Sequence, residues 1–137
     1  MTDNDYKSIL TQGKLKITNT RVAILTILSD NSLPLDVSQI EEALNQKKIH
    51  ANQVTVYRIL EALVNKKIIK RIDFQEGKFR YEMARDGHHH LICQQCGTVQ
   101  DVAECPVDEI EKNIGMRQHF IIKQHSLEFF GVCANCQ

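Results

Sequence analysis

Two Cys-x-x-Cys pairs near the end of the chain constrain its fold more than any other sequence feature. They are Cys93-Gln-Gln-Cys96 and Cys133-Ala-Asn-Cys136, with 36 residues between them. Each pair can present two thiolates to one tetrahedral ion, and zinc favours closed sites of four sulfur ligands. The spacing therefore predicts a structural zinc site that joins the end of a small domain to its start. A pair of redox dithiols is the alternative, but a thioredoxin-like motif needs a βαβ context, which the sequence lacks.

Charge and metal-binding residue types divide the chain into two parts. Its 137 residues include 17 Lys and Arg and 17 Asp and Glu, so the formal net charge is zero. Residues 1–83 contain 13 basic and 10 acidic residues, a net of +3, whereas residues 84–137 contain 4 and 7, a net of −3. All five Cys and five of the six His lie after residue 84. We therefore expect two small domains, 1–83 and 84–137, with different partners.

The first residues and the apolar runs predict a cytoplasmic protein. The sequence starts with polar and acidic residues, and no apolar segment typical of a signal peptide follows. The longest apolar stretch, residues 22–28, is far shorter than the ~20 residues that a membrane-spanning helix needs. In a reducing cytosol, cysteines are more often metal ligands or redox centres than structural disulfides.

Helical periodicity dominates the first half, and a hairpin follows it. Apolar spacing predicts helices over 5–12, 18–30, from 37 onward, and 52–66, and strands over 68–74 and 78–83. Asp36 is a suitable N-cap for the third helix. This order of elements is that of a winged helix-turn-helix. A small helical bundle with a hairpin is the alternative.

The predicted 52–66 helix carries polar side chains at its N-terminal end. Gln53, Thr55, Tyr57 and Arg58 can reach base edges and phosphates if this end enters a DNA groove. Basic residues flank the helix and hairpin: Lys47, Lys48, Lys66, Lys67, Lys70, Arg71, Lys78 and Arg80. A solvated charged surface is the alternative, but a basic hairpin beside a polar recognition helix favours phosphate docking.

The second half alternates strands with one helix. Segments 91–93 and 98–102 are predicted strands, a helix is expected from Pro106 to Gly115, and residues 120–132 are predicted to form a long strand or strand pair. The chain as a whole is therefore assigned to the α+β class, with residues 83–88 as a hinge between its two domains.

A run of three histidines, His88-His89-His90, lies just before the first Cys pair. On a strand, His88 and His90 point to one side and His89 to the other. His88 and His90, together with Glu82 and Asp101, make a mixed nitrogen and oxygen site suited to Fe(II), Mn(II) or Zn(II). Ordinary surface or core histidines are the alternative. The fifth thiol, Cys105, is interpreted as a small buried residue, with a soft ligand or redox-sensitive thiol as the alternative.

Several of these segments resemble the ferric uptake regulator family. The stretch Ala51-Asn-Gln-Val-Thr-Val-Tyr-Arg-Ile-Leu60 is similar to that family's recognition helix. The stretches 88–97 and 125–133 resemble its sensor-domain motifs, and Lys16-Ile-Thr18 with Arg21 resembles its N-terminal segment. The resemblance covers nearly the whole chain in order.

The resemblance implies a homodimeric, metal-dependent repressor of metal-uptake genes that binds AT-rich inverted repeats of double-stranded DNA. Its fold would be a winged helix-turn-helix followed by a small α/β dimerisation and metal-binding domain. The residues at the matching positions are Cys93, Cys96, Cys133 and Cys136 for structural zinc; Glu82, His88, His90 and Asp101 for the regulatory metal; His89, Asp108 and His125 for a further metal site; and Lys16, Tyr57 and Arg58 for DNA.

One departure from the family pattern concerns the regulatory site. Many members supply an additional His from the loop before the third helix, whereas Ser32-Leu-Pro-Leu-Asp36 contains none. Asp36 could substitute for it, or Glu82 could carry the coupling to the DNA-binding half alone. Carboxylate ligands favour iron-responsive regulation, with zinc-responsive regulation as the alternative and peroxide-responsive regulation third.

A metalloenzyme that uses the His cluster is the alternative from another functional class. Such an enzyme needs an open coordination position with a general acid or base beside it. The sequence contains no H-E-x-x-H motif and no evident nucleophile–base pair. We therefore predict a regulator rather than an enzyme.

Overall fold

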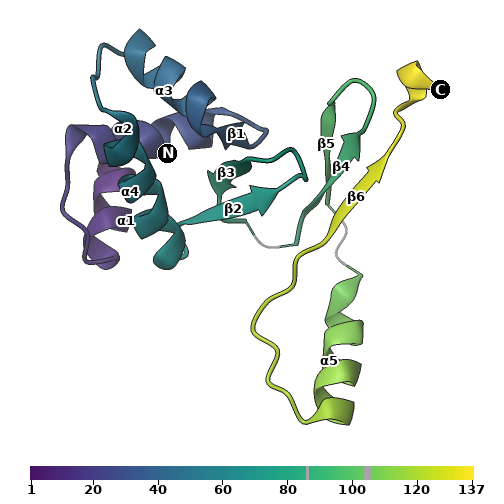
Figure 1. Cartoon of the computed structure of the whole chain (residues 1–137). Helices are drawn as coiled ribbons and strands as arrows, with labels where there is room; N and C mark the ends of the chain where they lie inside the picture. The colour runs from purple at the N-terminus through teal and green to yellow at the C-terminus, as the bar shows by residue number, and fades with distance from the viewer. Residues whose placement is uncertain (86, 104–105) are drawn as a thin grey trace. The chain divides into compact units, whose positions relative to one another are not determined.

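The computed structural model describes residues 1–85, 87–103 and 106–137. The chain forms two compact units, Met1–Ala84 and Arg85–Gln137, whose elements are labelled in Figure 1. Cys105, for which the sequence left two roles open, lies outside the described residues. Among the residues that are described, no helix has the length and apolar content needed to cross a membrane.

The first unit is a four-helix winged helix-turn-helix. Its elements are α1 (Asp3–Gln12), α2 (Asn19–Asp30), β1 (Leu35–Asp36), α3 (Val37–Gln46), α4 (Gln53–Asn65), β2 (Ile69–Asp73) and β3 (Phe79–Met83). The strands form an antiparallel sheet in the order β1-β3-β2. The four helices and the hairpin agree with the sequence prediction. Strand β1 was not predicted, because two residues are too few to show an alternating pattern.

Side-chain caps determine where three of the helices begin. The side-chain oxygens of Thr18, Asp36 and Asn52 accept hydrogen bonds from backbone N–H groups in the first turns of α2, α3 and α4. Such caps satisfy N–H groups that have no partner inside the helix. The sequence prediction of Asp36 as an N-cap is confirmed.

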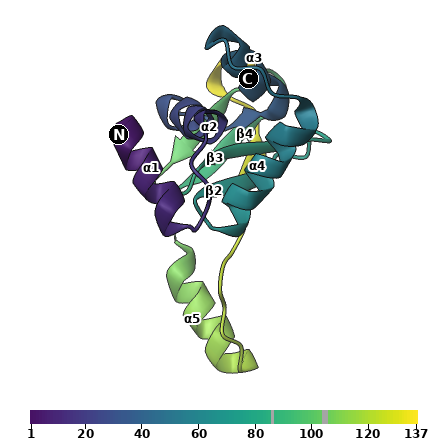
Figure 2. The ribbon, with the colours of Figure 1, turned by 90° about the vertical axis from the view of Figure 1, so that its left-hand side faces the viewer.

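The apolar faces of the helices meet in one core, around which the helices are arranged in Figure 2. Leu25 of α2, Ile40 of α3 and Leu60 of α4 are fully buried there. The apolar stripe predicted on α4 faces this core, since Val56, Ile59, Leu60 and Leu63 are all buried. The opposite face of α4 is thereby left to solvent or to a partner.

Three helices end in the same way, with a lysine in the left-handed backbone region. Lys14, Lys48 and Lys67 follow α1, α3 and α4 at φ angles of 58°, 59° and 59°. In each case the next residue, Leu15, Ile49 or Ile68, donates its N–H to a helix carbonyl five residues earlier and packs against the core. This is the geometry of a Schellman motif, in which glycine is the usual left-handed residue.

The second unit is built on a three-stranded sheet. Its elements are β4 (His89–Cys93), β5 (Val99–Val102), α5 (Val107–Gln118), β6 (Glu128–Gly131) and the short 3-10 helix η1 (Ala134–Cys136). Strand β4 is central; it pairs with β5 in antiparallel and with β6 in parallel orientation. Helix α5 lies between β5 and β6 in the chain. It is part of the long connection that the parallel strands β4 and β6 require.

Two predicted boundaries in this unit are wrong. Helix α5 does not stop at Gly115 but continues to Gln118. Glycine is needed there for a different reason, because a Cβ atom at Gly115 would lie 2.9 Å from the carbonyl oxygen of Phe120. The strand predicted over 120–132 is limited to Glu128–Gly131. Phe120 and Ile121, which suggested a strand, are 71% and 84% exposed.

The second unit has a small apolar core. Within its described residues, the buried hydrophobic side chains are only Ile92, Cys93 and Val99. Three consecutive histidines, His88 to His90, are buried beside them. A unit of this size with so little buried apolar surface needs another source of stability, such as a metal ion or a second subunit.

We expect Lys48→Gly to stabilise the first unit by about 0.5–1 kcal/mol, because glycine adopts a positive φ without a Cβ clash. The adjacent Lys47 has an ordinary φ of −85°. Lys47→Gly is therefore the control and should be neutral or destabilising, since it only adds freedom to the unfolded chain. Thermal and urea unfolding of the two variants measure the difference. A loss of stability in Lys48→Gly would contradict the interpretation of strain at this position.

Candidate functional site

The four cysteines of the two pairs converge at one point. Cys93 ends β4, and Cys96 follows it in the turn before β5; after β6, Cys133 directly precedes η1 and Cys136 is the last residue of η1. Their sulfur atoms all lie within 4.8 Å of one another, and the Sγ atoms of Cys96 and Cys133 are 3.7 Å apart. Zinc–sulfur bonds of about 2.3 Å at tetrahedral angles require sulfurs about 3.8 Å apart. The cluster therefore fits zinc and is typical of a structural zinc site.

Hydrogen bonds prepare the first pair of sulfurs to act as thiolates. The backbone N–H of Cys133 donates to Cys93 Sγ at 3.3 Å. This bond and a second one from the N–H of Cys96 lower the pKa of Cys93 to about 6. The Thr98 hydroxyl lies 3.1 Å from Cys96 Sγ, and this contact lowers the pKa of Cys96. Hydrogen bonding to the neighbouring sulfurs, Cys133 first, instead raises the pKa of Cys136 to about 12. A cation is needed to hold all four as thiolates.

A second cluster lies on β4 and β5. The rings of His88 and His90 are 5.0 Å apart, and their nearest potential ligand nitrogens lie within 4.8 Å. Asp101 is the partner of His90 in the β4–β5 register, and its Oδ1 is 3.6 Å from His90 Nε2. Two imidazoles and a carboxylate offer the donor types of a mixed nitrogen and oxygen metal site. Glu82 is buried near the end of β3 in the first unit.

The other side of β4 holds a third group. The ring of His89 is 5.2 Å from that of His125, and His89 Nδ1 is hydrogen-bonded to the carbonyl oxygen of Leu127 at 3.0 Å. The carboxylate beside His125 belongs to Glu111, whose Oε1 is 2.6 Å from His125 Nδ1. Asp108, the acidic residue singled out from the sequence, lies one helical turn earlier on α5. The spacing of three residues on one helix was the only sequence signal that could have indicated Glu111.

Helix α4 presents a polar surface away from the core. Gln53, Thr55, Tyr57 and Arg58 are exposed, while Val56 between them is buried. Gln53 and Tyr57 line a groove of about 700 Å³ together with residues of the hairpin, among them Gly77 and Phe79. This layout suits a nucleic-acid backbone running between a recognition helix and its wing. Lys16 is also exposed and lies just before α2, where its carbonyl oxygen accepts a hydrogen bond from Arg21.

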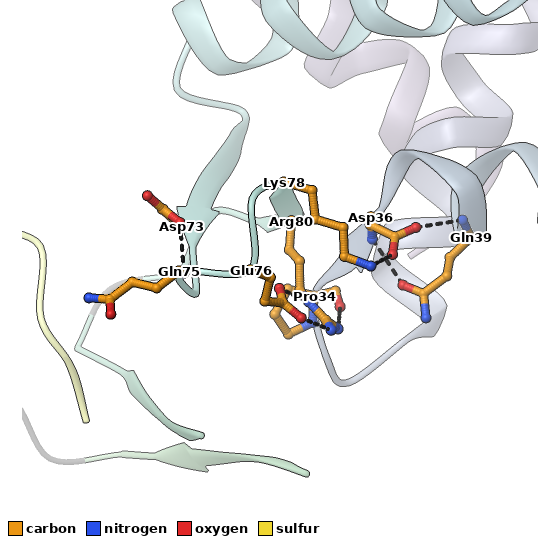
Figure 3. A network of polar contacts seen from close by, with 8 residues as sticks. All are labelled: Pro34, Asp36, Gln39, Asp73, Gln75, Glu76, Lys78 and Arg80. Atoms are coloured by element: carbon orange, nitrogen blue, oxygen red, sulfur yellow. Dashed lines mark hydrogen bonds and ion pairs between the residues drawn. The ribbon is translucent and has the colours of Figure 1, made fainter. Parts of the chain in front are cut away.

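The hairpin is less basic than its sequence suggests, because most of its cations have partners within the protein (Figure 3). Lys78 forms an ion pair with Asp36 at 2.6 Å. Arg80 binds both oxygens of Glu76 and contacts the carbonyl oxygen of Pro34. The guanidinium of Arg71 lies 4.5 Å from the centre of the Phe79 ring. The contacts with Asp36 and Pro34 fasten the hairpin to the segment before α3.

The same network decides the role of Asp36. Its Oδ1 accepts the N–H of Gln39 at the start of α3, and its Oδ2 accepts a proton of the Lys78 ammonium. Burial opposes ionisation of this carboxylate, but the bonds from Lys78 and Gln39 outweigh it, so the pKa of Asp36 is lowered. Both oxygens are thus engaged in capping and wing attachment. The suggestion that Asp36 replaces the absent histidine as a metal ligand is not supported by this arrangement.

Comparison with known proteins identifies the family. The profile of the ferric uptake regulator family matches residues 12–130. The chain belongs to this family. The ferric uptake regulation protein of Bacillus subtilis (strain 168) is 33% identical over 135 residues, covering 95% of this chain and 91% of that protein. The crystal structure of the Vibrio cholerae ferric uptake regulator superposes with a TM-score of 0.75 at 26% identity, covering 93% of this chain and 98% of that one.

Family membership defines the general activity but not the metal. Members of the ferric uptake regulator family are metal-responsive transcriptional regulators, so this protein is a regulator of that kind and not an enzyme. Binding of DNA and of metal ions is typical of the family. A peroxide-responsive repressor of Staphylococcus aureus (strain Mu50) is 29% identical over 128 residues, covering 93% of this chain and 86% of that protein. The two sequence identities, 33% to the ferric uptake regulation protein and 29% to the peroxide-responsive repressor, are too similar to distinguish an iron-responsive from a peroxide-responsive regulator.

Removal of zinc should unfold the second unit and leave the first folded. The second unit buries few apolar side chains, and structural zinc sites of this type contribute about 10–16 kcal/mol to folding. Chelation under reducing conditions should abolish amide-exchange protection in β4–β6 while α2 and α4 stay protected. Mass spectrometry of exchange together with metal analysis would show this. Unchanged protection of β4 after complete zinc loss would contradict a structural role.

We expect Asp36→Asn to lower the free energy of unfolding by about 1 kcal/mol at pH 7, because it removes the charge paired with the half-exposed Lys78. The pKa of Asp36 is lower in the folded than in the unfolded protein, so the charge contributes stability above the unfolded pKa of about 3.9. That contribution is lost as the pH falls through the folded pKa. Denaturant unfolding between pH 7 and pH 2 should show the difference shrinking.

The matched control for this prediction is Asp30→Asn at the exposed end of α2. It removes the same charge and should change stability by less than about 0.5 kcal/mol. A difference between Asp36→Asn and the parent protein that persists unchanged at low pH would assign the effect to capping geometry rather than to charge.

Proposed function

We propose that this protein is a homodimeric repressor of metal-uptake genes that binds its operator when ferrous iron occupies the site at His88 and His90. The observation that carries the proposal is the set of two buried imidazoles beside Asp101 in the unit that directly follows a winged helix. A ligand shifts a conformational equilibrium only if it binds the two states differently. A metal site beside the connection between the two units is suited to bind one arrangement of the units more tightly than another.

The proposed ligands are His88, His90, Asp101 and Glu82. Three of them come from the second unit, and Glu82 would be the ligand from the first. It precedes His88 by only six residues, and a carboxylate oxygen is a donor that Fe(II) and Mn(II) accept. A metal held by Glu82 and the two histidines would restrict the short connection at 83–88. Since Asp36 is engaged elsewhere, Glu82 carries the link to the DNA-binding unit in this proposal.

The ligand set favours iron over zinc by a small margin. Two carboxylates and two imidazoles offer hard oxygen and borderline nitrogen donors without sulfur, which suits Fe(II) and Mn(II) and is also compatible with Zn(II). Regulation by zinc is the alternative. The group of His89, His125 and Glu111, with Asp108 nearby on α5, is proposed as a further metal site in the same unit.

The proposed DNA-binding surface is the exposed face at the start of α4, with Lys16 as a further contact. Gln53, Thr55, Tyr57 and Arg58 would enter the major groove, because they lie opposite the buried stripe of this helix. In a dimer, two such helices would read the two halves of an AT-rich inverted repeat. The protein would act in the cytoplasm, where the operator is.

The second subunit is proposed to cover an apolar surface on the second unit. Ile110 and Ile114 of α5, Leu91 of β4 and Phe129 of β6 are all exposed. A monomer seldom exposes so many large apolar side chains in a unit of this size. Burial of the same surface on two copies would supply the core that the isolated unit lacks.

DNA binding with and without metal tests the proposal. The zinc-loaded protein should bind its operator weakly, and added Fe(II) under anaerobic conditions should tighten binding about 10-fold or more, as in typical allosteric couplings. Fluorescence anisotropy with Fe(II), Mn(II) and Zn(II) in turn would rank the metals. Equal affinity of the protein with and without every added metal would overturn the switch, and a response to Zn(II) alone would favour the zinc-responsive alternative.

Substitutions in the two proposed sites separate metal sensing from DNA contact. Arg58→Ala should weaken operator binding at saturating metal by about 1–3 kcal/mol without changing the dimer or the zinc content. His90→Ala should leave weak binding intact and remove the metal response. Lys123→Ala, at an exposed position after α5, is the control. Loss of dimerisation in Arg58→Ala would show that the variant reports folding instead of DNA contact.

A further inference from the structure

The two oxygens of Asp101 have different partners. Oδ2 accepts a hydrogen bond from an Nη atom of Arg85 at 3.0 Å, and Oδ1 faces Nε2 of His90 at 3.6 Å. The position of Oδ1 follows from the β4–β5 register, in which His90 and Asp101 are directly opposite. One oxygen is thus held by a guanidinium while the other is directed at the imidazole.

Arg85 is the first residue of the second unit, and it follows directly on Ala84, the last residue of the first. Neither its position in the sequence nor any motif indicated a role for it. Its side chain is half exposed, at 50%, and reaches Asp101 on β5. The contact joins the start of the unit to the strand that carries a proposed metal ligand.

We propose that Arg85 is a positioning residue for the regulatory metal site. It binds Oδ2 of Asp101 and so keeps Oδ1 beside His90 as a ligand that coordinates through one oxygen. Metal-bound carboxylates are commonly oriented by such outer hydrogen bonds. This inference rests on the proposed function only in placing the ion at His88, His90 and Asp101.

Two effects of Arg85 on metal affinity oppose each other. Its positive charge repels the cation. Its hydrogen bond, in contrast, orients the Asp101 carboxylate, which then loses less conformational freedom when the metal binds. The repulsion is weakened by solvent because the guanidinium is half exposed. Loss of an outer hydrogen bond to a metal ligand typically costs about 10–100-fold in affinity. Orientation should therefore prevail over repulsion.

The position of Arg85 gives this contact a consequence for signalling. Because Arg85 adjoins Ala84, its bond to Asp101 holds the chain at the point where the second unit begins. An ion that binds Asp101 would therefore also affect Arg85, which is bound to Asp101 and adjoins the DNA-binding unit in the sequence. In a chain without a histidine before α3, this is a route of coupling that needs no ligand from that loop.

Binding of Mn(II) to the zinc-loaded full-length protein, followed by electron paramagnetic resonance of the free ion, tests the inference. Arg85→Gln should weaken Mn(II) binding about 10-fold, within the range for outer ligands. Arg85→Lys should recover part of the affinity, because it keeps a charged donor. Lys123→Gln removes the same charge from the same unit at an exposed position outside α5 and should change affinity less than about twofold.

A double-substitution cycle shows whether Arg85 acts through Asp101. In an Asp101→Asn background, Arg85→Gln should cause no further loss. Zinc content and the unfolding midpoint should be the same in Arg85→Gln and the parent protein; a general structural role would change both. Tighter or unchanged Mn(II) binding by Arg85→Gln would overturn the positioning role.

His90→Ala separates this inference from the proposed function. If His90→Ala abolishes Mn(II) binding while Arg85→Gln has no effect, the regulatory site stands and the role of Arg85 fails. If His90→Ala leaves Mn(II) binding unchanged, the regulatory site itself is misplaced, and the role of Arg85 fails with it.

Discussion

Four sulfur atoms gathered within 4.8 Å of one another make the second unit depend on a cation. Hydrogen bonds favour the thiolate at Cys93, while the neighbouring sulfurs disfavour it at Cys136. A zinc ion would remove this conflict and join the ends of β4 and β6 across the unit. Because Ile92, Cys93 and Val99 are its only buried hydrophobic residues in the described part, little else holds the unit together. Because this zinc site would fix the end of β4, the position of the histidines at the start of β4 would depend on it.

The first unit is stabilised in a different way, by a large apolar core. Its helices bury a continuous core, and capped helix starts and three Schellman ends fix where each helix begins and stops. Two cations of its hairpin are matched internally, since Lys78 and Arg80 are bound to Asp36 and Glu76. This favours the N-terminal face of α4, more than the hairpin, as the proposed surface for DNA. A modest electrostatic attraction would suit the proposed switch, in which the operator is released when metal is scarce.

Much of the fold and part of the candidate site could be predicted from the sequence, because local rules determine them. Apolar periodicity located α1 to α4, and Asp36 marked the start of α3. The predictions failed where packing overrides the local pattern. Gly115 does not end α5; glycine is needed there because the backbone of Phe120 approaches it closely. Phe120 itself lies outside the described strand β6. The alternation of a strand separated His88 and His90 from His89, and the structure keeps that separation.

Residue types and their spacing along single elements were enough to indicate the candidate metal ligands, namely four thiols at zinc spacing and alternating histidines. They also indicated the polar start of α4. Which partners come together from different elements became apparent only from the fold. It directed Asp101 to both His90 and Arg85, placed Glu111 against His125, and engaged Asp36 with Lys78. Such pairings depend on strand register and packing, and therefore cannot be read from distances along the chain.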